Sequence, residues 1–171
     1  MNNVKALATD KSKIATLTKL VVLIGVAVAV PFFHQQLITG PVVNATLFIS
    51  TVILGTQMGM LVGLIPSVIA LSIGTLPAVL TPMIPYIMIS NVILILTFNY
   101  FRKKNFWLAV VSASFLKFIF LFATSTIVIN LLLKKELAES VSAMMSYPQL
   151  LTALAGGILA ALFLNLYNKR I

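Results

Sequence analysis

One lysine lies alone inside a long apolar segment of the sequence. Lys117 is in the middle of the stretch SFLKFIFLFAT, which covers residues 114–124. A charged side chain at the centre of a bilayer costs about 3 kcal/mol on insertion scales. All three acidic residues, Asp10, Glu136 and Glu139, lie in terminal or loop segments, so no carboxylate is placed to pair with the lysine. We predict that Lys117 faces a polar cavity and binds an anionic or acceptor-rich ligand; the alternative is that it snorkels toward the outer surface.

Asn91 is a second polar residue within an apolar segment, at the end of the stretch TPMIPYIMISN. At 1.5 Å per residue, Asn91 lies about 15 Å from Phe101, and Lys117 lies about 20 Å from Lys104. The two side chains therefore reach similar depths near the membrane midplane. Polar groups at this depth usually face the protein interior. Asn91 could contact the ligand, or it could only tie helices together.

Seven other residues complete the predicted binding site, because they lie toward the outer ends of apolar segments or share a helix face with Lys117 or Asn91. They are Asn44, Tyr86, Met88, Phe120, Thr124, Tyr147 and Gln149. Ala113 and Leu121 share the face of Lys117 as well. Aromatic rings among them could stack on a small ring. An unpaired cation suits a neutral or anionic ligand, and on this view removing it should weaken binding without destabilising the fold.

The composition places these residues in a membrane protein. The chain has 171 residues, of which 60% are hydrophobic and 9% charged, with a mean hydropathy of +1.10, unlike any soluble domain. Its net charge of +9 comes from short basic clusters between apolar segments, which is a topology signal rather than a nucleic-acid signature. The chain has no cysteine, and His34 is its only histidine. We therefore expect neither an enzyme nor a bound metal or cofactor.

Five apolar blocks define the spans, and the second is too long for a single crossing. The blocks cover residues 20–33, 42–73, 83–101, 107–133 and 150–167. One crossing needs about 20 residues. Basic residues lie before the first block, at 102–104 and at 169–170, and the positive-inside rule puts all of them in the cytoplasm only if 42–73 crosses twice. Glycines in the stretch GTQMG at 55–59 place the turn between the two crossings.

The sequence therefore predicts an all-α integral membrane protein with six transmembrane helices and both termini in the cytoplasm. Residues 1–15 are expected to form a cytoplasmic N-terminal segment of the single domain 1–171. The expected outer loops cover residues 34–41, 74–82 and 134–148.

Small residues recur at a four-residue spacing in two segments. Three glycines within residues 55–63 would let helix backbones approach closely inside the protein. Gly25 and Ala29 form a similar pair in the first segment, with Ala27 between them. In this first segment the spacing fits either an internal seam or a docking surface for another membrane protein.

The order of these motifs resembles the substrate-binding S component of energy-coupling-factor (ECF) vitamin transporters. The resemblance covers nearly the whole chain, through GPVVNATLFISTVILGTQMGMLVGLIPS, MIPYIMISN and YPQLLTALAGGILA. It implies a pocket on the outer side, between the first loop and helices four to six. It also implies a membrane coupling subunit and two cytoplasmic ATPases as partners, with ATP used by those ATPases, in the plasma membrane of a prokaryote. In that family an Ala-x-x-x-Ala motif docks on the coupling subunit; the matching residues here are Gly25 to Ala29, with glycine in place of the first alanine.

The pattern is most similar to S components assigned to pyridoxine or hydroxymethylpyrimidine, which implies a small, water-soluble ring compound as the substrate. Pantothenate, which carries a carboxylate, is the second choice of ligand. A function of a different class is a membrane scaffold or assembly factor that transports nothing. On that reading Lys117 snorkels, and the small-residue faces recruit another membrane protein.

Overall fold

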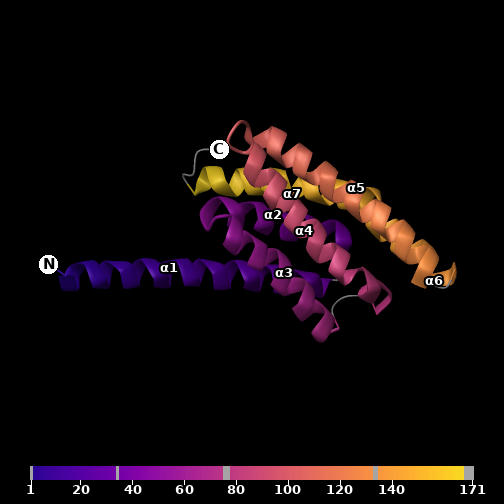
Figure 1. Cartoon of the computed structure of the whole chain (residues 1–171), viewed down its shortest axis with the longest axis horizontal. Coiled ribbons are helices and arrows are strands. Elements are labelled where there is room, and N and C mark those ends of the chain that lie inside the picture. Colours follow the sequence, from indigo (N-terminus) through magenta and orange to yellow (C-terminus); the bar gives the residue numbers. More distant parts are fainter. Residues whose placement is uncertain (1, 34, 75–77, 133–134, 168–171) are drawn as a thin grey trace.

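The computed structural model describes residues 2–33, 35–74, 78–132 and 135–167, and every regular element in these ranges is helical, as the sequence predicts (Figure 1). The α-helices are α1 (Asn2–Ala29), α2 (Gln36–Ile53), α3 (Thr56–Ser72), α4 (Ile84–Phe101), α5 (Phe106–Leu132), α6 (Lys135–Met145) and α7 (Tyr147–Leu166). Two short 3-10 helices, η1 (Val30–Phe33) and η2 (Ala78–Met83), precede α2 and α4. His34, Lys169 and Arg170 lie outside the described residues.

Five segments are long and apolar enough to cross a membrane, so the chain is a multi-pass membrane protein. They are Ser12–Phe33, Gln36–Ile53, Leu80–Phe101, Phe106–Ile129 and Val141–Leu166. Helix α3 is also apolar but has only 17 residues. At 1.5 Å per residue it is about 26 Å long, slightly shorter than a hydrocarbon core of about 30 Å. It lies at the short limit for a crossing.

The long apolar block 42–73 is divided into two helices at the predicted place. Helix α2 ends at Ile53 and α3 begins at Thr56. Gly55 between them has a φ angle of +89°. Residues with a Cβ rarely adopt positive φ, whereas glycine does so at no steric cost. The turn between α2 and α3 therefore depends on the glycine.

Two predicted outer loops are largely helical. Helix α2 begins at Gln36, so most of the loop predicted at 34–41 belongs to its first turns. The loop predicted at 134–148 contains α6 and the start of α7. Helix α6 contains charged residues, so a search for apolar runs does not find it. Its buried residues Val141 and Met145 are four positions apart and pack against the bundle.

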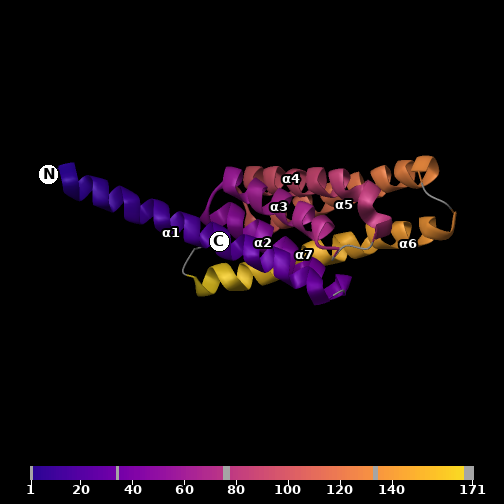
Figure 2. The same ribbon diagram turned by 90° about the horizontal axis from the view of Figure 1, so that it is seen from below.

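The helices form an elongated bundle with two distinct ends (Figures 1 and 2). Lys19 Nζ on α1 lies 5.8 Å from the ring centroid of Tyr167, just after α7. Phe106, which follows the basic turn 102–104, belongs to the same hydrophobic cluster as Leu164 of α7. Basic segments far apart in the sequence thus gather at one end, which we call the basic end. Helix α6 lies at the opposite end, the α6 end.

Helix α1 lies at the edge of the bundle. Its N-terminal half extends beyond the basic end, and its C-terminal half packs against α2 and α3 (Figure 1). Almost none of its apolar segment is buried. The exposed apolar residues include Ile14, Leu17, Val21 and Val22. One long apolar face of α1 is therefore left free by the rest of the chain.

Candidate functional site

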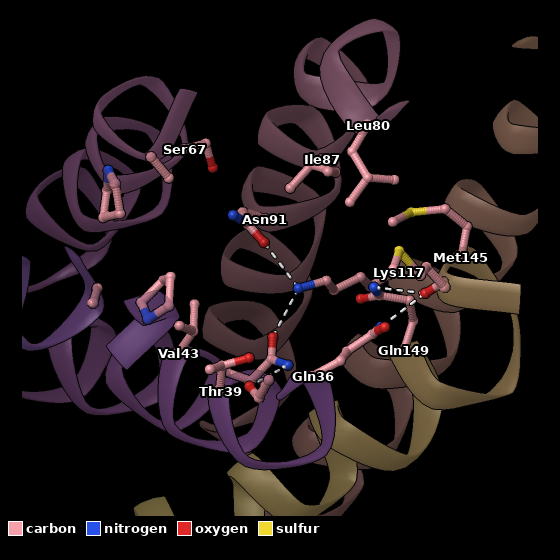
Figure 3. A pocket seen from close by; sticks show the side chains of 17 residues that line it. Gln36, Thr39, Val43, Ser67, Leu80, Ile87, Asn91, Lys117, Met145 and Gln149 are labelled. Atoms are coloured by element: carbon pink, nitrogen blue, oxygen red, sulfur yellow. Dashed lines mark hydrogen bonds between the residues drawn. The ribbon is translucent and has the colours of Figure 1, made fainter. Parts of the chain in front are cut away.

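A cavity of about 280 Å³ opens between the helices, toward the α6 end of the bundle (Figure 3). Residues from all of the α-helices and from η2 line it. Its apolar walls include Val43, Leu80, Ile87 and Met145. Its polar side chains are Gln36, Thr39, Asn44, Ser67, Asn91, Lys117 and Gln149. Apolar walls with a few convergent polar groups are typical of a site for a small molecule.

Lys117 extends from α5 into the bundle and is only 4% exposed. Its Nζ donates a hydrogen bond of 2.7 Å to Asn44 Oδ1 on α2 and one of 2.8 Å to Asn91 Oδ1 on α4 (Figure 3). The side chain therefore does not snorkel to the surface. Two amide oxygens take the place of the carboxylate that the apolar segments lack, and they offset part of the cost of burying an amine in the membrane.

Backbone carbonyls fix the orientation of both asparagines. Asn91 Nδ2 donates to the Gly63 carbonyl of α3 at 2.8 Å, and Asn44 Nδ2 donates to the Gly40 carbonyl at 2.9 Å. Each amide therefore turns its oxygen toward Lys117. Gly63 also permits the contact, because a Cβ there would lie 3.2 Å from Asn91 Cβ. The result is a polar cluster, Lys117–Asn44–Asn91, that links α2, α3, α4 and α5.

A close crossing of α2 and α7 supports Asn44. A Cβ at Gly156 would lie 2.7 Å from Asn44 Cβ and 2.9 Å from the Pro41 carbonyl oxygen, which is too close for any side chain. A Cβ at Gly40 would lie 2.7 Å from Thr152 Cβ. Small residues thus let the two backbones meet, as they commonly do between membrane helices. This packing outweighs the helix-breaking tendency of Pro41 and explains why the predicted loop is helical.

Two glutamines meet one backbone carbonyl at the part of the cavity nearest α6. Gln36 Nε2, at the start of α2, donates to the Met144 carbonyl at 2.8 Å. Gln149 Nε2, near the start of α7, donates to the same carbonyl at 3.1 Å (Figure 3). Met144 lies in the last turn of α6, where helix carbonyls have no partner within the helix. The glutamines therefore attach the end of α6 to the bundle.

The remaining hydrogen-bonding capacity shows what the cavity offers to a ligand. An ammonium has three N–H donors, and Lys117 uses two of them on the asparagines. One donor is left at the inner part of the cavity. Gln36 and Gln149 use amide hydrogens on Met144, and no described residue donates to their Oε1 atoms. The cavity thus offers a ligand one hydrogen-bond donor, from Lys117, at its inner part, and hydrogen-bond acceptors, from Gln36 and Gln149, near the α6 end.

Four of the nine predicted binding residues line the cavity: Asn44, Asn91, Lys117 and Gln149. The similar depth predicted for Lys117 and Asn91 is confirmed by their hydrogen bond. Five predicted residues lie outside the lining: Tyr86, Met88, Phe120, Thr124 and Tyr147. Tyr147 is 73% exposed and its ring stacks on Phe118, with centroids 6.0 Å apart.

The residues on the helical face of Lys117 were expected to surround the ligand, but they do not line this cavity. Thr124 donates its hydroxyl hydrogen to the Phe120 carbonyl within α5. Ala113 and Leu121 are fully buried in two hydrophobic clusters. The reason is the length of the lysine side chain, which carries its amine away from α5 to α2 and α4. The neighbours along α5 pack elsewhere.

Other lining residues were not predicted from the sequence. Gln36 and Thr39 lie within the loop expected at 34–41, so they were not expected to be on a helix that faces the site. Ser67 lies in an apolar helix with no neighbouring polar residue to mark it. Met144 takes part through its backbone carbonyl, for which no sequence signal exists.

The three predicted docking residues on α1 do not share one face. Gly25 and Ala29 are exposed, and a Cβ at Gly25 would meet no heavy atom within 4 Å. Ala27 is fully buried and lines the cavity. Two residues along a helix correspond to a rotation of about 200°, so Ala27 points to the opposite side. It belongs to the cavity and not to an outer docking surface.

No protein-family model, curated protein or solved structure matches the chain. Within the described ranges, no group of three histidine, aspartate or glutamate side chains is placed to hold a metal ion. The function proposed below therefore rests on the geometry of the cavity around Lys117.

Proposed function

We propose that the chain is a membrane-embedded binding protein that captures a small, water-soluble compound in the cavity beside Lys117. One observation carries this proposal: a buried lysine is held by two oriented asparagines at the side of a cavity, with one donor left for a ligand. A purely structural lysine would not need a cavity beside it. Buried polar groups within a membrane bundle commonly mark the path or site of a polar substrate.

The proposed orientation puts the basic end in the cytoplasm and the α6 end outside. The turn 102–104 and the exposed residues Lys13 and Lys19 lie toward one end, in keeping with the positive-inside rule. In this orientation α3 is the sixth crossing, and both chain ends face the cytoplasm. The cavity then lies in the outer half of the membrane, where a compound from outside the cell reaches it first.

The proposed ligand is a single-ring vitamin or vitamin precursor such as pyridoxine or hydroxymethylpyrimidine. A volume of about 280 Å³ is at the small end of the range for ligand sites. Ring nitrogens accept hydrogen bonds and would suit Lys117, while hydroxyl groups would donate to Gln36 and Gln149. Pantothenate is the second choice, with its carboxylate toward Lys117.

The proposed setting is an ECF-type importer, with a membrane coupling subunit and two ATPases as partners. None of the five candidate spans contains an acidic residue that could couple transport to protons. The free apolar face of α1 offers a surface for a second membrane protein. Gly25 and Ala29 lie exposed on α1. Replacing both with tryptophan should reduce recovery of the complex and leave ligand binding unchanged.

Calorimetry on two neighbouring variants tests the binding function. Ser67→Trp places a large ring in the cavity, whereas Val68→Trp is a matched control because Val68 is 48% exposed on the outside of α3. We expect the parent protein and Val68→Trp to bind one of the three named compounds, and Ser67→Trp to lose at least tenfold in affinity. Thermal unfolding of both variants shows whether they are folded.

The scaffold alternative gives a different result. If the parent protein binds none of the three compounds, and native mass spectrometry finds no small molecule bound to it after purification, the binding proposal fails. Equal binding by both tryptophan variants would move the site away from this cavity.

A further inference from the structure

A second pocket, of about 410 Å³, lies at the basic end, beside the turn between α4 and α5. It is lined by Leu96, Asn99, Tyr100, Lys103 and Lys104. It is separate from the cavity at Lys117, with which it shares no residue. Nothing in the proposed uptake function requires it.

The polar groups of this pocket are arranged as hydrogen-bond donors. Arg102 Nε donates to Asn99 Oδ1 at 3.0 Å, which occupies the amide oxygen and leaves the Asn99 amide hydrogens without an acceptor among the described residues. Lys103 and Lys104 are both exposed. The Tyr100 hydroxyl can donate as well. Several donors and two cations with no carboxylate among the lining residues suit a phosphate group.

The apolar side of the pocket distinguishes a lipid from a free anion. Leu96 lies one helical turn before Tyr100 and is 49% exposed, on the membrane side of the lysines. Trp107 is 51% exposed nearby at the start of α5, where aromatic residues mark the membrane boundary. A phosphate on the lysines would place an acyl chain along Leu96. We propose that this pocket binds the headgroup of an anionic glycerophospholipid.

Native mass spectrometry of the delipidated protein in detergent tests this proposal. The protein is titrated with phosphatidylglycerol and, separately, with zwitterionic phosphatidylcholine. The double variant Lys103→Gln/Lys104→Gln should bind phosphatidylglycerol about 25-fold more weakly, which is fivefold, or about 1 kcal/mol, for each lysine. The control is Lys13→Gln/Lys19→Gln, which removes the same charge from exposed residues of α1. Its affinity should stay within about twofold of the parent.

Three results would overturn the proposal. An equal loss in both double variants would mean diffuse charge attraction and no site. Equal binding of the two lipids would mean that the phosphate charge is not recognised. Displacement of phosphatidylglycerol by excess inorganic phosphate, together with unchanged lipid binding by Leu96→Gln, would mean a site for a free anion. None of these results depends on whether the cavity at Lys117 binds a vitamin.

Discussion

Lys117 and Asn91 are 26 residues apart in the chain, and their side chains share a hydrogen bond of 2.8 Å inside an apolar bundle. Asn91 is bonded in turn to Gly63 of α3, and Lys117 to Asn44 of α2. Helix association in lipid lacks the hydrophobic driving force that acts in water, so side-chain hydrogen bonds between helices carry more of the specificity. This cluster is the centre of both the fold and the proposed site.

Lys117→Met should reduce both stability and ligand binding. The substitution leaves Asn44 Oδ1 and Asn91 Oδ1 buried without their donor, at about 1–3 kcal/mol for each unsatisfied group. The loss of a charge-assisted bond to the ligand should lower affinity by about ten- to hundredfold. Thermal unfolding in detergent and calorimetry measure the two effects. Lys13→Met is the control, because Lys13 is exposed on α1; an unchanged unfolding midpoint for Lys117→Met would show that the cluster contributes nothing to the fold.

Gly156→Ala should destabilise the crossing of α2 and α7. The new Cβ would lie 2.7 Å from Asn44 Cβ and 2.9 Å from the backbone nitrogen of Ala45, so a helix has to shift. We expect a loss of about 1–3 kcal/mol, the usual cost of overpacking, and weaker ligand binding because Asn44 moves. Gly25→Ala adds the same methyl group where nothing lies within 4 Å. It should be neutral or slightly stabilising, and equal midpoints for the two variants would exclude a close crossing.

Gln36→Leu and Gln149→Leu should act together and not independently. Either glutamine alone still donates to the Met144 carbonyl, so each single variant should cost only about 0.5–1 kcal/mol. The double variant leaves this carbonyl without a donor and should cost more than the sum of the two. Hydrogen–deuterium exchange of α6 reports the effect locally. Strict additivity would mean that the shared carbonyl does not hold α6 in place.

Single-cysteine labelling tests the orientation of the bundle. The chain has no native cysteine, so Gln57→Cys at the α2–α3 turn and Thr81→Cys in η2 can each be labelled without background. Both residues are exposed; Gln57 lies in the first turn of α3, and Thr81 lies in η2, which follows the other end of α3. A reagent that does not cross the membrane should label Thr81→Cys in intact cells and should label Gln57→Cys only after lysis. Labelling of both variants in intact cells would exclude α3 as a complete crossing.

The sequence predicts the depth at which the polar cluster lies in the membrane, but it does not predict which side chains contact one another. Rise per residue and the positions of the basic residues are enough to place Lys117 and Asn91 at one depth. The direction of a long side chain is set by tertiary packing, so the amine of Lys117 reaches a cavity that its neighbours along α5 do not line. Asn44 was placed near the outer start of its helix because the first turns of α2 were read as a loop.

Other features of the site leave even less trace in the sequence. Ala27 follows the small-residue pattern of an outer face, yet it is fully buried and lines the cavity. Whether Ala27 faces the cavity or the outside depends on how α1 is rotated against α2 and α3. The local sequence pattern does not specify that rotation. The Met144 carbonyl is a backbone atom that any residue type would supply. Features of this kind depend on the assembled bundle.

The polar cluster also sets the axial register of the helices, that is, how far each helix is shifted along its axis relative to its neighbours. Apolar contacts are not directional, so by themselves they specify the axial position of a helix less sharply than hydrogen bonds do. A hydrogen bond of 2.7 or 2.8 Å does not survive a shift of one turn, about 5.4 Å. Because Asn44, Gly63, Asn91 and Lys117 come from four helices, the cluster fixes the axial register of α2, α3, α4 and α5 at a single level. A change that removes the cluster would therefore leave the axial register of these four helices to apolar and close backbone packing alone.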